Sequence, residues 1–474
     1  MWYMFFSQQV IPGHFWYLDA LRILVRVLIG LFAILLAVPP LVWYERRLLG
    51  WMQQRQGPNR VGPFGLLQTI ADGVKLLFKE DMNPRDVDTT LFVLAPAVFL
   101  VPSLVTSAVI PWNNNPIWGA PAPHVGIGLL YILAWGSLGV YGIVMAGWSS
   151  NNKYSLLGGL RSSAQMISYE LGMGMAVMMV VLLTGSLGLN DVVQAQGYFP
   201  ISGTLTHYGI ELPEWNVFKF FPLGFLATII YVITMLAETN RAPFDLPEAE
   251  TELVAGYHTE YTSMKFATFF MGEYANMIVV SAIAATLFFG GYQAPIPWLG
   301  QLPAAIANLY AQWGVPRLTD FINDFIPIIW LTLKVLGGLY FFIWIRATLP
   351  RLRYDMLMKF GWQGVLPIAL MNLVLLAVAI SVSYIVAGIA WFIIFGVTLS
   401  FFSQSRRIQK FVGNVRRDTT VVLNRNAVPY CGVPQHSGEG FQTLPPDASV
   451  GTFGVLRSER EADLADDAAL AGKV

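Results

Sequence analysis

Residues 21–44 have the sequence LRILVRVLIGLFAILLAVPPLVWY, an apolar run interrupted only by two arginines near its start. A helix rises by about 1.5 Å per residue, so this run is long enough to cross the roughly 30 Å of hydrocarbon in a bilayer. Eight further apolar runs lie at 89–110, 127–148, 164–185, 221–238, 266–290, 326–346, 363–381 and 385–402. The last two are only a few residues apart, so they form either a tight hairpin or one span plus a re-entrant segment. We predict an all-α polytopic membrane protein with about eight or nine transmembrane helices.

The composition supports a chain that lies mostly in lipid. Of its 474 residues 55% are hydrophobic and 12% are charged, whereas soluble proteins carry about 25% charged residues. Lys and Arg balance Asp and Glu at 29 each, so net charge gives no reason to expect a nucleic acid partner. Cys431 is the one cysteine, and no two of the five histidines have metal-ligand spacing. We therefore predict no metal and no redox centre on this chain.

The distribution of Lys and Arg orients the apolar runs. With the N-terminus outside, the inside segments 45–88, 149–164, 239–265, 346–362 and 403–474 together hold 24 Lys and Arg residues, and the outside segments hold four. Cytoplasmic loops of membrane proteins carry the excess of these residues. We therefore expect the N-terminus outside and the C-terminus in the cytoplasm, in a bacterial inner membrane.

Two stretches outside the apolar runs differ from ordinary loops, one by its helical periodicity and the other by its polar composition. In FGLLQTIADGVKLLFKED, at 64–81, Leu67, Ile70, Val74 and Leu77 recur at helical spacing while the charged residues fall elsewhere. This pattern predicts an amphipathic helix along the cytoplasmic interface. Beyond 403 the sequence becomes polar, first basic and then rich in Gly, Pro and acidic residues. We expect 403–474 to be a polar cytoplasmic tail, of which 425–474 is disordered.

Besides the arginines near the ends of the runs, four charged residues lie within them, where insertion of a charge costs about 2.5–3.5 kcal/mol. Glu170, Glu238 and Glu273 lie near the cytoplasmic ends of three runs, and Lys334 lies midway along a fourth. Structural pairing inside the bundle explains any one of them. Three acids near the same side of the membrane favour a second interpretation, because carboxyl groups in apolar surroundings can exchange protons near neutral pH.

The densest acidic stretch is AETNRAPFDLPEAETELVAGYHTEY, at 237–261. It contains Glu238, Asp245, Glu248, Glu250, Glu252 and Glu260, with Arg241 as its one cation. A solvated cytoplasmic loop is one explanation. The interleaved apolar residues and two prolines argue against it, because a freely solvated loop has no need of them. Closely spaced carboxylates titrate as a coupled set, a property that suits a proton relay.

Four motifs in register resemble the quinone-site membrane subunit of complex I, the proton-pumping NADH:quinone oxidoreductase; in bacteria this component is named the H subunit. They are ERRLLGWMQQRQGPNRVGPFGLLQTIADGVKLLFKE at 45–80, YSLLGGLRSSAQMISYE at 154–170, the acidic stretch at 237–261, and WIRATLPRLRYD at 344–355. The resemblance runs from about residue 20 to about 380. It implies a transmembrane quinone-site domain over 1–402, and it says little about 385–402 or the tail.

The resemblance implies that the chain lines part of a chamber where a quinone, ubiquinone or menaquinone, is reduced and coupled to proton translocation. It implies iron–sulfur clusters and FMN on partner subunits, with peripheral iron–sulfur subunits and antiporter-like membrane subunits as partners. By motif position it places Glu45, Arg46 and Arg55 near the entrance of the quinone chamber, with Arg353 on the facing cytoplasmic segment. It implies two sets of catalytic acids: Glu170, Glu238 and Glu273 along an intramembrane proton path, and Asp245, Glu248, Glu250 and Glu252 on the loop beside the chamber. Arg161 and Arg241 are the implied charge partners, and Lys334 either pairs with Glu273 or holds water.

Two other functions are compatible with parts of this pattern. The corresponding component of a membrane-bound hydrogenase-like complex need not bind quinone, and the full basic and acidic sets at 45–60 and 237–261 favour the quinone form. A stand-alone ion transporter explains intramembrane acids, but such proteins usually show broken helices in repeated halves. The sequence shows no internal repeat. For each arginine taken singly, anchoring at the cytoplasmic interface is an adequate explanation.

Overall fold

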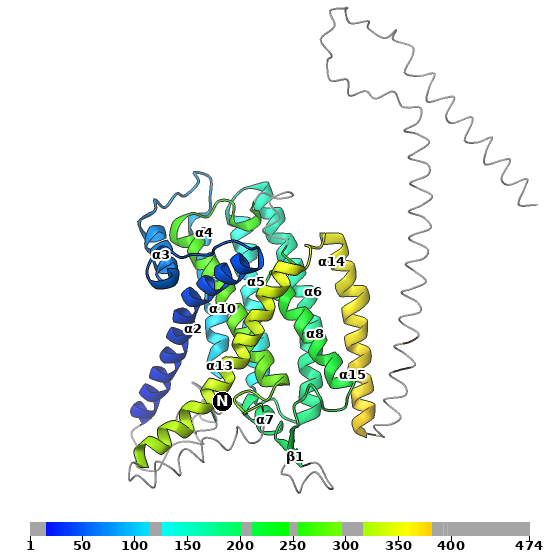
Figure 1. The fold of residues 1–474 in the computed structure, drawn as a ribbon. Helices are drawn as coiled ribbons and strands as arrows, with labels where there is room; N and C mark the ends of the chain where they lie inside the picture. Colours follow the sequence, from blue (N-terminus) through cyan, green and yellow to red (C-terminus); the bar gives the residue numbers. More distant parts are fainter. Residues whose placement is uncertain are drawn as a thin grey trace, which may run out of the picture. The chain divides into compact units, whose positions relative to one another are not determined.

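The computed structural model describes residues 16–113, 126–200, 211–245, 255–295 and 316–381, together with Phe392 and Gly396 (Figure 1). Within these ranges the regular secondary structure is helical apart from one antiparallel pair of three-residue strands, and seven helices are long and apolar enough to cross a membrane. The prediction of an all-α polytopic membrane protein is therefore confirmed. The tail at 403–474 lies outside the described residues, as does the run at 385–402 except for Phe392 and Gly396.

The seven long helices lie over the predicted apolar runs. They are α2 (Trp16–Met52), α4 (Thr89–Thr106), α5 (Gly128–Ser149), α6 (Lys153–Thr184), α10 (Ser263–Phe288), α13 (Pro316–Thr348) and a last one built from α14 (Tyr354–Phe360), the π-helical turn η5 (Gly361–Val365) and α15 (Leu366–Ser381). An eighth apolar helix, α8 (Leu223–Glu238), has 16 residues and rises by about 24 Å.

Several helices extend well beyond their apolar runs, and two of them bear on the site. Helix α2 continues to Met52, so that Glu45 and the following arginines are on a helix. Helix α6 begins at Lys153, eleven residues before its predicted start, because the side chain of Asn152 accepts a hydrogen bond from the Tyr154 amide (2.9 Å) and caps the first turn. Apolarity alone marks where a helix enters lipid, whereas capping decides where it begins.

The amphipathic helix is α3 (Gln68–Phe78), preceded by the short 3-10 turn η1 (Pro63–Gly65). Its apolar residues Leu67, Ile70, Val74 and Leu77 are all exposed in this chain, as a helix lying on a membrane surface requires. The hydroxyl of Ser263, at the start of α10, donates to the carbonyls of Leu76 and Lys79, both at 2.9 Å. Helix α3 is thereby fixed to the end of the bundle, as Figure 1 shows.

Close approaches hold the spans together. Helix α4 packs against α5 and α10, and α6 packs against α5, α8 and α15. At the contact between α4 and α5, a Cβ on Gly142 would lie 2.7 Å from the Phe99 amide nitrogen, so only glycine permits this approach. On α6, Tyr169, Met173 and Val180 are buried while Leu171 and Met178 are exposed on the opposite face. An apolar exterior over an apolar interior is the pattern of a helix in lipid.

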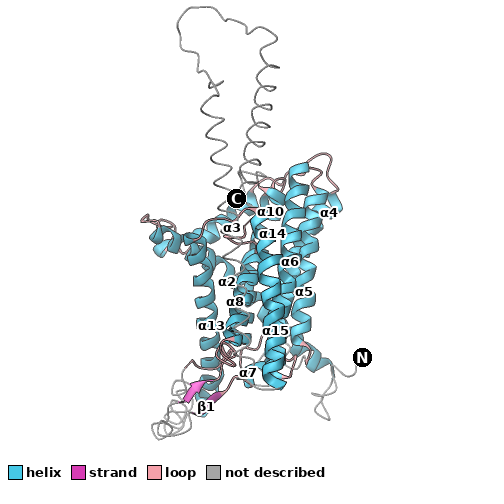
Figure 2. Ribbon diagram, turned by 90° about the vertical axis from the view of Figure 1, so that its right-hand side faces the viewer, coloured by secondary structure: helices cyan, strands magenta, loops and turns pink. Residues whose placement is uncertain are grey.

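The opposite end of the bundle carries α7 (Leu189–Gln194) and the antiparallel pair β1 (Tyr198–Pro200) and β2 (Glu211–Pro213) (Figure 1 and Figure 2). There Gln196 donates to the Thr286 carbonyl (2.8 Å) and Asn216 to the Leu287 carbonyl (2.7 Å). These amides satisfy orphan carbonyls at the C-terminal end of α10.

Candidate functional site

The described part of the acidic stretch is built into the bundle. After α8 ends at Glu238, Arg241, Phe244 and Asp245 are all buried. Gln165 on α6 donates to the carbonyls of Ala237 and Phe244, both at 2.8 Å. The Asp245 carboxylate pairs with Arg351 at 3.0 Å. This half of the stretch is therefore not a solvated loop.

Arg241 lies between two buried carboxylates. Its guanidinium is 3.6 Å from Glu273 on α10 and 4.0 Å from Glu45 on α2. It also lies over the ring of Tyr274, 4.4 Å from the ring centroid. The prediction of Arg241 as a charge partner thus has a geometric basis, and Arg241 joins the two acids electrostatically.

Glu45 was predicted at the entrance of a chamber, but it is 97% buried within the bundle. Tyr274 donates a hydrogen bond to one of its carboxylate oxygens at 2.6 Å, and Arg346 on α13 donates to the other. Glu45 therefore connects α2, α10 and α13. Arg346 is a site residue that we did not assign from sequence, although it stands in the motif at 344–355.

Glu273 has two more neighbours from the same stretch of chain. The Tyr257 hydroxyl donates to Glu273 Oε1 at 3.1 Å, and Nε2 of His258 lies 3.6 Å from the same oxygen. Both residues belong to the 3-10 turn η4 (Gly256–His258) and are buried. Neither was assigned from sequence, because isolated histidine and tyrosine residues gave no recognisable signal there.

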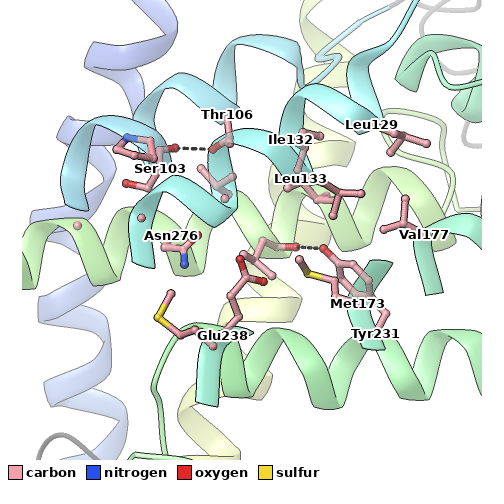
Figure 3. A pocket seen from close by; sticks show the side chains of 18 of the residues that line it. Ser103, Thr106, Leu129, Ile132, Leu133, Met173, Val177, Tyr231, Glu238 and Asn276 are labelled. Atoms are coloured by element: carbon pink, nitrogen blue, oxygen red, sulfur yellow. Dashed lines mark hydrogen bonds between the residues drawn. The ribbon is translucent and has the colours of Figure 1, made fainter. Parts of the chain in front are cut away.

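Glu238 has no cation beside it among the described residues. One of its carboxylate oxygens, Oε2, is fully buried and makes no hydrogen bond within the described part of the chain. The carboxylate faces a small cavity of about 40 Å³ between α4, α5, α6, α8 and α10. Figure 3 shows Glu238 and Asn276 pointing into this space, with Ser103 and Thr106 beyond.

The cavity wall leaves room for the Glu238 carboxylate. A Cβ on Gly136 would lie 3.6 Å from Glu238 Oε1, in van der Waals contact. Most of the remaining wall is apolar, from residues such as Ile132, Met173 and Val280. A buried carboxylate without a partner in such surroundings is costly in its ionised form. The arrangement therefore suits a group that gains and loses a proton.

Glu170 on α6 is half-buried, and no hydrogen bond or ion pair joins it to another residue within the described ranges. Its carboxylate is close enough to Glu238 to interact electrostatically. The two acids thus form a pair without a described counter-ion. Glu45 and Glu273 differ from these two acids, because each of them lies beside at least one guanidinium group.

The remaining arginines predicted for the quinone chamber are on the surface. Arg46 pairs with Asp72 at 2.5 Å and joins α2 to α3. Burial would raise the pKa of the Asp72 carboxyl, but hydrogen bonds from Arg46 and Gln68 hold this pKa below its usual value. Arg55 and Arg353 are exposed. Arg55 Nε donates to the side-chain oxygen of Gln53 at 2.7 Å. Arg353 Nε lies 3.9 Å from the Asp355 carboxylate.

Lys334 does not reach Glu273. Its ammonium group donates to the carbonyls of Phe289, Gly291 and Gln293 at 2.6–2.8 Å, beyond the C-terminal end of α10. Glu273 is 16 residues earlier in the chain than Phe289, about 24 Å along a helix. Pairing with Glu273, one of the two possibilities for Lys334, is therefore incorrect, because the depth of each residue along its span was not known. Arg161, the other predicted charge partner, lies over the ring of Tyr354, with its guanidinium carbon 5.5 Å from the ring centroid.

Three predicted acids, Glu248, Glu250 and Glu252, lie outside the described residues, so the structure places none of them. Within the described ranges, no group of three or more His, Cys, Asp or Glu residues is arranged to hold a metal ion.

The fold and site define a polytopic membrane protein with paired and unpaired carboxylates buried near one end of its bundle. A family model described as NADH dehydrogenase matches residues 25–377. The H subunit numbered 2 of the NADH-quinone oxidoreductase of Koribacter versatilis is 44% identical over 375 residues, covering 76% of this chain and 96% of the relative. The H subunit of the same enzyme from Rickettsia prowazekii is 48% identical over 344 residues, covering 73% and 89%.

The chain therefore belongs to the NADH dehydrogenase family and is an H subunit of an NADH-quinone oxidoreductase, a membrane component of respiratory complex I. These matches do not favour the hydrogenase-like and stand-alone transporter alternatives.

Proposed function

We propose that this protein lines part of the quinone chamber of complex I and passes protons linked to quinone reduction along Glu238 and Glu170. The observation that carries the proposal is the unpartnered Glu238 oxygen beside a cavity. An internally paired structural acid has its counter-ion in place, as Glu45 does. Glu238 lacks one among the described residues, which is the state expected of a proton carrier.

The paired cluster has a different role in this proposal. Ion pairs join Glu45, Arg241, Glu273 and Arg346, which come from α2, α10, α13 and the segment after α8. Reduction of a quinone creates negative charge, which is compensated by proton uptake or by a shift of nearby charges. A cluster of alternating charges transmits such a change, because each pair responds to its neighbours.

The quinone, ubiquinone or menaquinone, is the substrate, and its electrons come from flavin and iron–sulfur centres on other subunits. We place Arg55 and Arg353 at the entrance of the chamber and the basic surface near α3 under the peripheral iron–sulfur subunits. Antiporter-like membrane subunits receive the protons beyond Glu170. These assignments are supported by the motifs and by the exposure of both arginines.

We place the N-terminus outside and the C-terminus in the cytoplasm of a bacterial inner membrane. The 24 to 4 distribution of Lys and Arg supports this orientation. The segments on the inside also contact one another at one end of the bundle. Ser263 contacts Lys79, Asn152 donates to Glu260 at 2.7 Å, and the Leu352 amide donates to the Pro243 carbonyl at 3.0 Å.

The test is the double variant Glu170→Gln with Glu238→Gln. Glutamine keeps the volume and most hydrogen bonds but cannot take up and release a proton. We expect the complex to assemble and to keep NADH:ferricyanide activity, while quinone reduction and acidification of inverted vesicles are lost together. Glu80→Gln, at an exposed position, is the matched control. Normal pumping in the double variant would refute the relay.

A further inference from the structure

Lys334 is a charged residue within a span that the proposed relay does not use. Its ammonium group donates to the carbonyls of Phe289, Gly291 and Gln293 at 2.6, 2.8 and 2.7 Å. An ammonium has three N–H donors and a neutral amine has two, so three acceptors at these distances match the charged form. The ring of Trp215 lies beside the ammonium, with its centroid 4.9 Å from Nζ. Lys334 is therefore held in one place by all three of its donors.

The three carbonyls belong to the turn that ends α10. Gly290 has a φ of 72°, and the Gly291 amide donates to the Ala285 carbonyl at 2.8 Å, so the chain turns away directly after the helix. Carbonyl oxygens at the C-terminal end of a helix lack partners within it and favour a cation. A Cβ on Gly290 would lie 2.6 Å from Trp215 Nε1, so the turn packs directly on the indole. Lys334 thus caps α10 from another helix, α13.

Helices α10 and α13 are joined at two further levels. Midway along the pair, a Cβ on Gly338 of α13 would lie 3.2 Å from the Cβ of Ser281 on α10, so the two helices approach closely there. Nearer the start of α10, the Glu45 carboxylate accepts from Tyr274 on α10 and from Arg346 on α13. The three levels follow one another in opposite order along the two helices, as an antiparallel pair requires. The pair is therefore fixed lengthwise at both ends.

The two ends of α13 constrain each other through the helix. Lys334 and Arg346 are 12 residues apart, about 18 Å along the axis. A slide of α13 by the rise of one residue is about 1.5 Å, half the length of a hydrogen bond. Such a slide would misalign the Arg346 guanidinium with Glu45, because a charged hydrogen bond of this kind depends on its geometry. The contacts of Lys334 oppose this slide.

We propose that Lys334 sets the lengthwise position of α13 against α10 and so places the Arg346 guanidinium at the Glu45 carboxylate. Lys334 is a positioning residue, because it acts through Arg346, about 18 Å away along α13. Without its contacts α13 is free to slide, and Glu45 loses the fixed geometry of its pair. The effect of this change on turnover rests on the proposed function, in which the cluster of Glu45 and Glu273 responds to charge formed on the quinone.

The experiment uses the whole complex in membranes, with Lys334→Met. Methionine keeps much of the length of the side chain but has no donor. Thr332→Val is the matched control, because Thr332 is exposed on the same helix and its hydroxyl donates to the Ile328 carbonyl of that helix. NADH:ferricyanide activity reports assembly, and NADH:quinone activity gives kcat and the KM for quinone.

We expect Lys334→Met to lower kcat by roughly 10- to 100-fold, because a misplacement of about 1 Å caused far from the chemistry has effects of this size. The KM for quinone should stay unchanged, since the substitution leaves the entrance arginines in place. Thr332→Val should match the wild type in both constants. A wild-type kcat in assembled Lys334→Met would overturn the proposal.

A variant at Arg346 separates positioning from a general loss of stability. Arg346→Lys keeps a cation near Glu45 but loses the planar fork of donors. Substitutions about 18 Å apart ordinarily act independently, within about twofold. If Lys334 acts through Arg346, Lys334→Met should lower kcat much less in Arg346→Lys than in the wild type. Independent effects of the two substitutions on kcat would show that Lys334 does not position Arg346.

A further measurement leaves the lysine in place. The amides of Gly291 and Gln293 are hydrogen-bonded within the turn after α10, so they exchange slowly with solvent while the turn is held. If α13 transmits position between its ends, Arg346→Met should speed hydrogen exchange at these two amides, and Thr332→Val should not. Unchanged exchange in Arg346→Met would overturn the proposal even where Lys334→Met does not assemble.

The failure of this proposal and the failure of the relay give different results. Normal pumping in the double variant Glu170→Gln with Glu238→Gln would remove the relay, while hydrogen exchange at the end of α10 would still decide whether Lys334 positions α13. Unchanged exchange in Arg346→Met beside an inactive double variant would remove the positioning role and leave the relay.

Discussion

Replacing Arg346 with methionine removes one of the groups that hold the buried Glu45 carboxylate. Arg346 donates to Glu45 Oε1, while Tyr274 holds the other oxygen at 2.6 Å and Arg241 lies 4.0 Å away. Two unit charges 4 Å apart interact by about 4 kcal/mol at an effective dielectric constant of about 20. Breaking a buried pair costs about 3–5 kcal/mol, most of it from the charge left behind. Because Glu45 keeps its contacts with Tyr274 and Arg241, we expect Arg346→Met to lower the stability of the folded protein by about 3 kcal/mol, the lower end of this range.

The assay is thermal inactivation of the solubilised complex, whose rate measures kinetic stability. A loss of about 3 kcal/mol corresponds to roughly 100-fold faster inactivation, if the contact is absent from the transition state for unfolding. The double variant Glu45→Gln with Arg346→Met removes both partners. We expect its loss of stability to be smaller, by at least about 1 kcal/mol, than the sum of the losses in the two single variants. The effects of substituting residues in contact are not additive.

Arg353→Met is the control for this experiment. Its side chain is 74% exposed and lies 3.9 Å from Asp355, so its removal should change stability by less than about 0.5 kcal/mol. Additive effects of Glu45→Gln and Arg346→Met would refute the reasoning, as would an Arg346→Met variant that inactivates as slowly as Arg353→Met. Either result would mean that the pair contributes nothing to holding α2 against α13.

Three further outcomes are expected. A cysteine placed at Glu80, an exposed position after α3, should react with a membrane-impermeant thiol reagent only from the cytoplasmic side; labelling from outside intact cells would reverse the topology. Truncation beyond about residue 425, outside the family match at 25–377, should leave assembly and NADH:quinone activity near wild type, and a large loss would show that the tail docks on a partner. Arg55→Ala or Arg353→Ala should raise the apparent KM for quinone or lower kcat while ferricyanide activity is kept, whereas unchanged quinone kinetics would make both residues simple anchors.

The parts of the fold that follow from local periodicity were predictable. Helix α3 was expected from Leu67, Ile70, Val74 and Leu77, and the structure leaves those side chains exposed on its outer face. The long helices follow from apolar runs for the same reason, since a run in lipid must satisfy its backbone hydrogen bonds internally. The start of α6 was not predictable from apolarity, because it is fixed by one cap at Asn152.

Contacts between spans were the part that sequence alone did not reveal. Glu45 stands beside Arg46 in the chain, yet its partners are Arg346 and Tyr274, more than 200 residues away. Pairing of Lys334 with Glu273 was one of two possibilities, but Lys334 on α13 contacts the Phe289 carbonyl beyond the C-terminal end of α10, whereas Glu273 is in the first half of that helix. His258 escaped notice because its surroundings come from Phe266, Phe269 and Phe270, which in sequence are only an apolar helix face. The sequence shows that a charged residue in a span needs a partner. Which residue is that partner depends on the depth of each side chain in the membrane and on the direction in which it points from its helix.

The two kinds of buried acid explain why a relay needs both. Glu273 and Glu45 are held by guanidinium groups, so their ionised forms are stabilised and respond to charge placed nearby. Glu238 is beside a mostly apolar cavity with one oxygen unpartnered within the described chain, so its ionised form is stabilised only while positive charge or water is close. In the relay that we propose, a shift of charge in the paired cluster changes how readily Glu238 gives up its proton, because a nearby charge alters the cost of the ionised form. Direction in this relay arises from the difference between the two kinds of acid, because a carboxylate beside a guanidinium releases its proton and a buried carboxylate without a counter-ion holds it.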